Sequence, residues 1–303
     1  MRNITDTGLL TPSAVALGFF DGLHLGHIAV VERALFRAGG GRGEKTALSS
    51  VVFTFNDKTA LPKFREKRGS SIITFEQKAA LFDEVGVDCL YAPDFGEVKD
   101  FSARAFVEDI LRERLRAAYV VCGYDFRFGK GGEGDPSLLS ALCREGGIEC
   151  EIVPPVRVDG EIVSSTEIRR LIRLGEIERA NRFLGYELSY ALPVIKGNAL
   201  GRTIGFPTIN QKIPDEMVRP KNGVYKSWAV VGGRTYRAVT NIGVKPTVSD
   251  SGEILMETHI VGFSGDLYGE TVKVALRGYL REEIKFASVE ALKARLAYDR
   301  SIV

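Results

Sequence analysis

The sequence predicts an α/β protein in two parts, a parallel sheet covered by helices followed by an antiparallel β-barrel that ends in a helix. In the first half, short apolar runs alternate with helix-period segments, which is typical of a parallel sheet. From about residue 187, strand-like runs follow one another with glycine-rich turns between them. Because the pattern changes from alternating strands and helices to consecutive strands near residues 184–188, we expect domains at 1–186 and 187–303.

The expected elements of the first half combine buried strands with amphipathic helices. Strands are predicted at residues 14–19, 48–55, 89–91, 119–122 and 148–153, and helices at 27–38, 75–82 and 102–116. Such alternation implies right-handed crossovers, so the strands point the same way. Ligands of parallel sheets bind at the carboxyl ends of the strands, and we expect the functional residues there.

The second half carries a different pattern. Strands are predicted at residues 188–195, 224–231, 236–242, 255–261 and 271–279, and a helix at 288–298 that opens with Ser288 as its N-cap. Gly232-Gly233 and Gly262 to Gly265 supply turns between these strands. Consecutive strands without intervening helices indicate an antiparallel barrel.

Composition excludes several classes of protein. The 303 residues include 41 Lys and Arg against 39 Asp and Glu, a formal charge of +2, so neither a nucleic-acid nor a membrane partner is expected. Four cysteines lack Cys-x-x-Cys spacing, which favours buried thiols over structural zinc. The start has no apolar signal core. We expect a cytoplasmic protein that acts on small molecules, and the sequence leaves weak self-association open.

The densest motif of the first half follows its first strand and reads Gly-Phe-Phe-Asp-Gly-Leu-His-Leu-Gly-His. Glycines there let a ligand approach the backbone, and the helix that follows presents N–H groups suited to phosphate. His24 and His27 can face one phosphate group and stabilise charge during phosphoryl chemistry. Alternatively they are ordinary turn histidines, although two of the chain's three histidines lie here. Candidate ATP-binding residues are Gly18, Phe19, Phe20, Asp21, Gly22, His24, Gly26 and His27.

A second candidate anion site opens a later helix at residues 164–169. Ser164 and Glu167 fit a capping box, which alone indicates only a helix start. The hydroxyls of Ser164, Ser165 and Thr166 together with Arg169 also suit a triphosphate. This element and the His-x-Gly-His turn resemble the nucleotidyltransferase superfamily.

A third segment, residues 123–130, narrows the resemblance. It reads Gly-Tyr-Asp-Phe-Arg-Phe-Gly-Lys and resembles the flavin-proximal loop of the bacterial FAD synthetase module. The resemblance implies that Asp125 helps to hold substrate and that Phe126 and Phe128 pack near the flavin. The alternative is an aromatic turn that seals the core. One departure is Phe55-Asn56-Asp57-Lys58, where the family often has Phe-x-Pro-His-Pro, so the local substrate contacts can differ.

The second half carries its own motif over residues 196–210, which includes Gly-Phe-Pro-Thr-Ile-Asn. Alternation places Thr208 and Asn210 on one face of an extended segment, where their oxygens can reach Mg²⁺ bound to ATP phosphates. Nearby glycine amides can wrap the phosphates. The motif resembles the riboflavin kinase barrel, with Ile209 in place of alanine. Candidate ATP-binding residues are Gly197, Gly201, Arg202, Gly205, Phe206, Pro207, Thr208 and Asn210.

The riboflavin kinase resemblance also implies the remaining roles of the second half. Activating a primary hydroxyl requires a general base, which the resemblance assigns to Glu257; otherwise Glu257 is an exposed strand carboxylate. His259 shares its face and is expected to be structural. The segment 280–286 lies beside the flavin in the family, so Arg281, Glu283 and Phe286 are flavin-binding candidates.

Together the motifs resemble the bacterial bifunctional riboflavin kinase/FMN adenylyltransferase family over residues 14–300. The implied fold is a Rossmann-like nucleotidyltransferase domain followed by a riboflavin kinase barrel with a C-terminal helix. ATP and Mg²⁺ are the implied cofactors, with riboflavin, FMN and FAD as substrates and products. Two alternative functions remain. One is a nucleotidyltransferase that acts on another phosphate compound and uses the barrel only to bind a ligand. The other is a flavin-sensing regulator whose kinase-like barrel has no catalytic activity.

Overall fold

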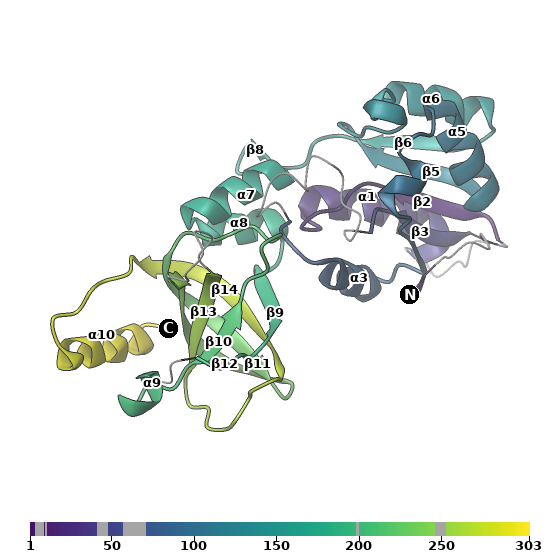
Figure 1. The fold of residues 1–303 in the computed structure, drawn as a ribbon. Coiled ribbons are helices and arrows are strands. Elements are labelled where there is room, and N and C mark those ends of the chain that lie inside the picture. The colour runs from purple at the N-terminus through teal and green to yellow at the C-terminus, as the bar shows by residue number, and fades with distance from the viewer. Residues whose placement is uncertain (4–8, 10, 41–47, 57–70, 198–199, 246–252) are drawn as a thin grey trace. The chain divides into compact units, whose positions relative to one another are not determined.

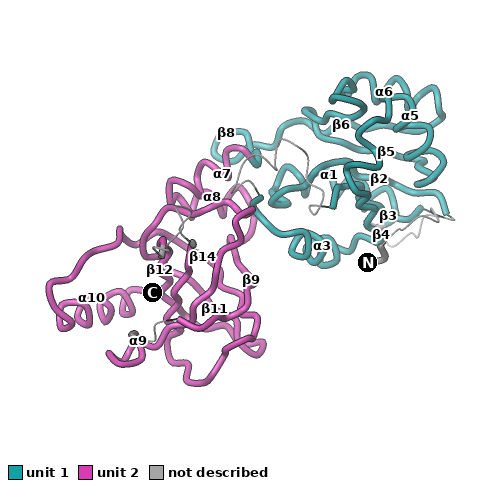
Figure 2. The backbone as a smooth tube through the Cα atoms, in the orientation of Figure 1, with its two compact units in different colours: residues 1–67, 71–165 teal, residues 68–70, 166–303 magenta. Residues whose placement is uncertain are grey.

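The computed structural model describes residues 1–3, 9, 11–40, 48–56, 71–197, 200–245 and 253–303 (Figure 1). The chain divides into two compact units, and Figure 2 colours residues 1–67 and 71–165 differently from residues 68–70 and 166–303. Each unit contains one main sheet. We describe each unit by itself.

The first unit is built on a parallel sheet in the order β1-β4-β3-β2-β5-β6. Its strands are β1 (Arg2–Asn3), β2 (Ser13–Leu17), β3 (Ser49–Phe53), β4 (Cys89–Tyr91), β5 (Ala117–Gly123) and β6 (Glu149–Val153). β2 lies in the middle and is buried along its whole length. After Ser13, whose hydroxyl donates to the Leu115 carbonyl, every residue of β2 is apolar, as a strand covered on both faces requires. The predicted parallel sheet is therefore confirmed.

Helices cover the two faces of this sheet. They are α1 (Leu25–Leu35), which continues into η1 (Phe36–Gly40), α3 (Phe75–Glu84), α4 (Phe95–Val98), α5 (Ala103–Ala105), which continues into η3 (Phe106–Arg114), and α6 (Pro136–Glu145). α1 packs against β2, β3 and β5. Val15 and Leu17 belong instead to a core cluster with residues of η3 and α6. Because successive strand residues face opposite ways, α1 covers the other face.

Local sequence explains where these helices begin. Thr74 caps α3, since its hydroxyl accepts from the Gln77 amide while the Gln77 side chain accepts from the Thr74 amide. Asp135 caps α6, and Pro136 occupies the first turn, where no amide donor is needed. The sequence-based prediction did not include α6, although these two residues mark its start. A short hairpin of β7 (Arg157–Val158) and β8 (Glu161–Ile162) lies between β6 and residue 165.

The second unit is an antiparallel barrel with helices before and after it. Its elements are α7 (Ser165–Leu174, of which Ser165 belongs to the first unit), α8 (Ile177–Leu184), β9 (Ser189–Pro193), α9 (Leu200–Thr203), β10 (Ile209–Lys212), β11 (Gly223–Val231), β12 (Arg234–Lys245), β13 (Glu253–Ile260), β14 (Thr271–Arg281) and α10 (Val289–Ser301). The strand order is β10-β13-β12-β11-β14-β9. A bridge between Ile195 and Asn210 joins the segment after β9 to β10, so the sheet closes on itself.

The barrel interior includes a polar seam. The hydroxyls of Ser227, Thr240 and Thr258 form a chain, with oxygen separations of 2.7 Å and 2.9 Å. The buried Gln211 amide donates to the carbonyls of Leu192 and Val272 and so ties β10 to β9 and β14. Buried polar groups are tolerated when they are hydrogen-bonded, and these bonds fix the closure of the barrel.

The C-terminal helix begins as the sequence predicts, because the Ser288 hydroxyl accepts from the Ala291 amide. Most of α10 is exposed, and Asp299 is its buried residue. Among the described residues, no helix has the length and apolar character needed to cross a membrane.

Candidate active sites

The Gly18–His27 segment forms a tight turn directly after β2, at the carboxyl edge of the parallel sheet. Its backbone takes left-handed values at Phe20, Gly22 and Leu23, with φ of 55°, 82° and 33°. A Cβ at Gly18 would lie 2.8 Å from the ring of the buried Phe20, and a Cβ at Gly22 would lie 2.9 Å from Ile72. The glycines are therefore required by close packing as well as by backbone conformation.

The two histidines of the motif lie face to face. His24 caps α1, and its Nδ1 accepts from the His27 amide at 3.3 Å. The two rings stack with centroids 3.6 Å apart, and His27 meets the edge of Phe20 at 5.3 Å. The structure thus brings both histidines to the N-terminus of α1, where helix amides favour an anion. α1 begins at Leu25, two residues before the expected start, because His24 itself is the cap.

Buried side chains from distant segments anchor the turn. The Phe19 carbonyl accepts from the Thr54 hydroxyl at 2.8 Å and from the Lys78 ammonium at 3.1 Å. The buried Asp21 carboxylate accepts from the Ile72 amide at 2.8 Å. The Ser165 hydroxyl donates to the Asp21 carbonyl at 2.9 Å. Sequence reasoning missed Lys78; a lysine among the apolar positions of a predicted helix was the available signal.

Ser164 and Ser165 belong to the first unit, whereas Thr166 and Arg169 belong to the second. Within the first unit, Ser165 contacts Asp21 of the turn. Thr166 is exposed and Arg169 half-buried. Glu167 binds Arg170, which lowers the pKa of the Glu167 carboxyl.

The loop after β5 lies beside the turn, because β5 pairs with β2 in parallel and Leu17 is opposite Cys122. Asp125 is exposed, and the rings of Phe126 and Phe128 stack at 5.8 Å. Phe128 is buried against Phe106, so it seals the core as the alternative interpretation supposed. Phe126 is half-buried and remains the flavin-facing candidate. Asp57 and Lys58 of the unusual segment after β3 lie outside the described residues.

The C-terminal motif folds into a compact loop in front of β10. A Cβ at Gly197 would lie 2.4 Å from the Asn210 amide nitrogen, and a Cβ at Gly201 would lie 2.3 Å from the Phe206 carbonyl oxygen. Gly205 has φ of 85°. Close packing therefore requires glycine at positions 197 and 201, and the left-handed backbone favours glycine at position 205. Arg202 and Pro207 are exposed, whereas Phe206 is buried.

Three strands bring the polar side chains of this site into one row. Asn210 of β10 is opposite Glu257 of β13, which is opposite Asn241 of β12. Directly opposed residues of antiparallel strands share a face, so Glu257 lies between two carboxamides. Asn241 also donates to Glu283 at 3.1 Å. Sequence reasoning matched residues 241–243 to the family but gave Asn241 no role, because its position beside Glu257 becomes visible only through strand register.

A cavity of about 280 Å³ adjoins this row. Its lining comes from the loop, the strands, the segment after β14 and α10: Gly201, Ile204, Phe206, Thr208, Val224, Val239, Asn241, Glu257, His259, Arg281, Glu283, Ile284, Phe286, Leu292 and Leu296. The Glu257 side chain is exposed, so its carboxylate can meet a ligand. His259 contacts the Pro207 carbonyl at 2.9 Å and the Phe206 ring edge-on, in keeping with its expected structural role.

The flavin-side candidates of the second unit occupy the wall of this cavity. Arg281, Glu283 and Phe286 all line it. The Arg281 guanidinium binds the buried Asp299 carboxylate at 2.7 Å. Thr208 and Asn210 offer a hydroxyl and an amide oxygen beside the glycine loop, a donor set that suits Mg²⁺ held mainly by substrate phosphates.

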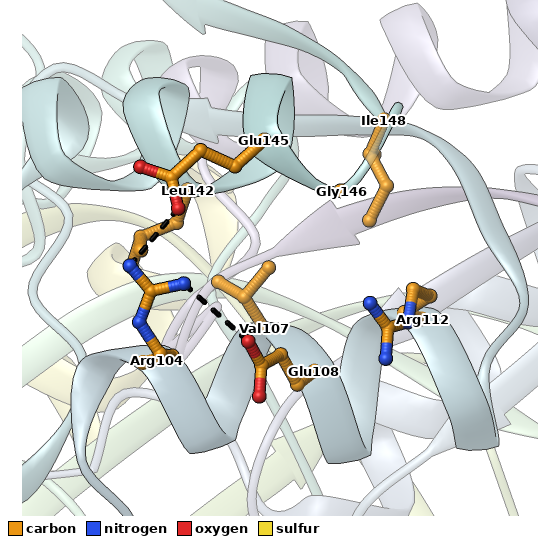
Figure 3. A pocket seen from close by; sticks show the side chains of 8 residues that line it. All are labelled: Arg104, Val107, Glu108, Arg112, Leu142, Glu145, Gly146 and Ile148. Atoms are coloured by element: carbon orange, nitrogen blue, oxygen red, sulfur yellow. Dashed lines mark hydrogen bonds and ion pairs between the residues drawn. The ribbon is translucent and has the colours of Figure 1, made fainter.

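A second, smaller cavity of about 180 Å³ lies in the first unit between η3 and α6 (Figure 3). Figure 3 shows Arg104 between Glu108 and Glu145, with which it forms ion pairs of 3.4 Å and 2.9 Å. Gly146 and Ile148 of its lining precede β6. The cavity therefore lies toward the amino end of that strand, away from the Gly18–His27 turn.

The fold and the two motif sites define a two-part transferase of the ATP-using kind. Residues 7–167 match the family model described as FAD synthetase, and residues 184–303 match the one described as riboflavin kinase. The protein from Listeria monocytogenes is 37% identical over 94% of this chain and 89% of its own length. That from Escherichia coli K12 is 33% identical over 94% and 90%. Both are named bifunctional riboflavin kinase/FMN adenylyltransferase, and the chain belongs to this family.

A solved structure agrees with this assignment at the level of the fold. The crystal structure of a Streptococcus pneumoniae protein described as a macrolide-efflux protein superposes with a TM-score of 0.86. It is 30% identical in sequence, and the alignment covers 100% of this chain and 98% of the other. The chain is thus a bifunctional enzyme of flavin biosynthesis, with an N-terminal FAD synthetase region and a C-terminal riboflavin kinase region.

Proposed function

We propose that the two transfers occur at the two sites described above, with riboflavin phosphorylated within residues 187–303 and FMN adenylylated within residues 1–186. The observation that carries the proposal is the row of Asn210, Glu257 and Asn241 beside a cavity, set apart in sequence from the His24–His27 turn. The FAD synthetase match ends at residue 167 and the riboflavin kinase match begins at residue 184, so the proposed boundary after residue 186 falls just inside the start of the second match.

In the kinase reaction, Glu257 acts as general base. Its carboxylate accepts the proton of the riboflavin primary hydroxyl as the hydroxyl oxygen bonds to the γ-phosphorus of ATP and the bond to ADP breaks. Gly197, Gly201 and Gly205 with Arg202 hold the phosphates of ATP, next to Phe206 and Pro207. Thr208 and Asn210 would hold Mg²⁺, which would neutralise developing charge on the phosphate oxygens. Arg281, Glu283 and Phe286 form the flavin side.

In the adenylyl transfer, an FMN phosphate oxygen attacks the α-phosphorus of ATP and pyrophosphate leaves. His24 and His27 stabilise charge on the phosphate oxygens, supported by the amides that begin α1. Neither reaction passes through a bond to the protein. Asp125 and Phe126 orient the flavin and Phe128 supports Phe126. The remaining candidates hold the nucleotide: Gly18, Phe19, Phe20, Asp21, Gly22, Gly26, Ser164, Ser165, Thr166 and Arg169.

The partners follow from this chemistry. The substrates are small molecules, and the near-balanced charge of +2 gives no reason for a nucleic-acid or membrane partner. We further place the protein in the cytoplasm, where four cysteines without a pairing pattern would stay reduced. Self-association, if it occurs, is weak.

One experiment tests the function as a whole. The purified protein is incubated with riboflavin, ATP and Mg²⁺, and the flavins are resolved by chromatography over time. We expect FMN to appear first and FAD to follow. FMN that accumulates without FAD would contradict the N-terminal half of the proposal, and unchanged riboflavin would contradict the kinase half. Omission of Mg²⁺ in a parallel reaction tests the metal requirement.

A further inference from the structure

The C-terminal helix α10 forms part of the wall of the proposed riboflavin kinase cavity, although most of its residues are exposed. Leu292 and Leu296 line the cavity, yet both remain partly exposed. Within the described residues of α10, Asp299 is the buried residue. An isolated helix of this length is marginal in water, and tertiary contacts normally hold it in place. With so little apolar burial, polar contacts are important for holding α10 in place.

Asp299 makes the strongest of these contacts. Its side chain is 0% exposed, and its Oδ2 accepts from Arg281 at 2.7 Å and 3.0 Å, through both the terminal and the inner nitrogen. Its Oδ1 accepts from Arg295 of α10 itself at 3.0 Å. The Arg281 side chain is only 11% exposed and also donates to the Glu282 carbonyl at 2.9 Å. A carboxylate that accepts two nitrogens of one guanidinium fixes the orientation of that group.

Arg281 is the last residue of β14, and the chain continues from it through the cavity wall. Arg281, Glu283, Ile284 and Phe286 line the cavity, and Glu283 reaches Asn241 beside Glu257. The next residue of α10 after Asp299 is Arg300, whose guanidinium lies 5.2 Å from the ring of Phe206, another residue that lines the cavity. One turn of α10 therefore contacts both the flavin-side segment and the phosphate loop.

We propose that Asp299 is a positioning residue of the kinase site, whose buried carboxylate clamps Arg281 to α10 and so holds the flavin-side wall of the cavity in its binding arrangement. This inference rests on the proposed assignment of that cavity to riboflavin. Asp299 does not touch the reacting atoms, and it acts through Arg281 and the segment that follows.

The charge of Asp299 is the essential feature. Removing the carboxylate charge leaves two guanidinium groups facing a neutral amide, with Arg281 nearly excluded from water. An uncompensated buried charge is strongly unfavourable, so Arg281 would turn toward solvent and the wall would lose its anchor. A substrate then binds only the fraction of molecules with the wall in place, which raises the apparent KM by the inverse of that fraction.

The test compares Asp299→Asn with Arg295→Gln, which removes the other partner of the same carboxylate. If one molecule in ten keeps the wall in place, KM for riboflavin rises about tenfold in Asp299→Asn while kcat changes less than about twofold. Arg295→Gln should leave KM within about twofold, because Arg281 keeps its bond to Asp299. An unchanged KM in Asp299→Asn, or a fall in kcat alone, would overturn the proposal.

A double-mutant cycle distinguishes a specific interaction between Asp299 and Arg281 from a general loss of structure. Arg281→Lys keeps a cation but loses the planar fork, and it should raise KM in the same direction. If the two residues act as one clamp, the double variant raises KM no further than Asp299→Asn alone. Effects that multiply would show independent roles and contradict the clamp. Should Asp299→Asn fail to fold, an unchanged KM in Arg281→Lys would overturn the proposal by itself.

The bifunctional chain supplies its own control. Conversion of supplied FMN to FAD is measured in every variant, and it should match the unmodified protein, because the adenylyl transfer uses the other region. Failure of the proposed function is distinguishable, since the unmodified protein would then form no FMN from riboflavin. If only the clamp proposal is wrong, the unmodified protein still forms FMN, and Asp299→Asn has the same KM for riboflavin as the unmodified protein.

Discussion

The two proposed phosphate sites differ in how they are built. The N-terminal turn is fixed by packing and by hydrogen bonds to its backbone. Phe20, Asp21 and His24 are all buried, and the Phe19 carbonyl accepts from Thr54 and Lys78. The C-terminal site instead exposes Glu257 and takes its wall from a mostly exposed helix. The first site is preformed by packing, whereas the second is assembled from side chains of several segments. This difference predicts how each site responds to substitution.

The largest effect is expected at Glu257, the proposed general base of the kinase reaction. Glu257→Gln removes the proton acceptor while it keeps the shape of the side chain, so FMN formation should fall by about 10²–10⁴-fold. Conversion of FMN to FAD should not change. Chromatography of both reactions gives the measurement. Glu270→Gln is the matched control, an exposed barrel carboxylate outside the cavity. A similar fall in the control would remove the special role of Glu257.

A comparable but smaller effect is expected at the N-terminal turn. His27→Ala removes a donor for the phosphate oxygens, so FAD formation from FMN should fall by about 10²–10³-fold. Because His27 stacks on His24, part of this loss comes from reorientation of His24. Phosphorylation of riboflavin should proceed as before. Loss of both activities in a folded variant would contradict the existence of two independent sites.

The sequence predicted the architecture because its signals are local. The apolar run that begins at Ala14 of β2 indicates a strand buried on both faces, and Ser288 marks the start of α10. The two glycine motifs are equally local, since each glycine answers a close contact or a left-handed backbone within its own loop. Short elements with weak periodicity, such as β10, were missed as strands and noticed only as part of a motif.

Residues whose role depends on distant partners could not be found in this way. Lys78 is a helical lysine until the fold brings it 3.1 Å from the Phe19 carbonyl. Asn241 becomes a neighbour of Glu257 only through strand register. Asp299 is an ordinary helical acid until Arg281, 18 positions away, meets it in the interior. Charged and amide side chains are usually solvent-facing, so their burial is a property of the tertiary structure.

A glycine pair tests how far packing fixes the N-terminal turn. Gly22 and Gly86 have similar φ of 82° and 85°, but a Cβ at Gly22 would lie 2.9 Å from Ile72, whereas one at Gly86 meets nothing within 4 Å. Gly86→Ala should lower the free energy of unfolding by about 1 kcal/mol through backbone strain alone. Gly22→Ala should lower it by about 2–3 kcal/mol and also reduce FAD formation. Denaturant unfolding and both activities give the measurements; equal effects would show that packing on Ile72 is unimportant.

The smallest expected effect concerns the thiols, all four of which belong to the first unit. A hydrogen bond from Cys143 lowers the pKa of the half-buried Cys150 thiol, whereas burial is the main cause that raises the pKa of Cys122 to about 12. The thiolate is the reactive form, so iodoacetamide at pH 8 should label Cys150 first.

Mass spectrometry of the labelled protein locates the modified residue, and Cys150→Ser should abolish the rapid phase. Cys150 lies early in β6, opposite Val120 and away from the carboxyl edge that carries the Gly18–His27 turn. Labelling should therefore reduce FAD formation by less than about twofold and leave FMN formation unchanged, since a surface substitution away from a site is usually mild. Rapid labelling of Cys143 or Cys122 would contradict the order of reactivity. A loss of FMN formation on labelling would show that the two regions are coupled, against the separation on which the comparison of the two sites depends.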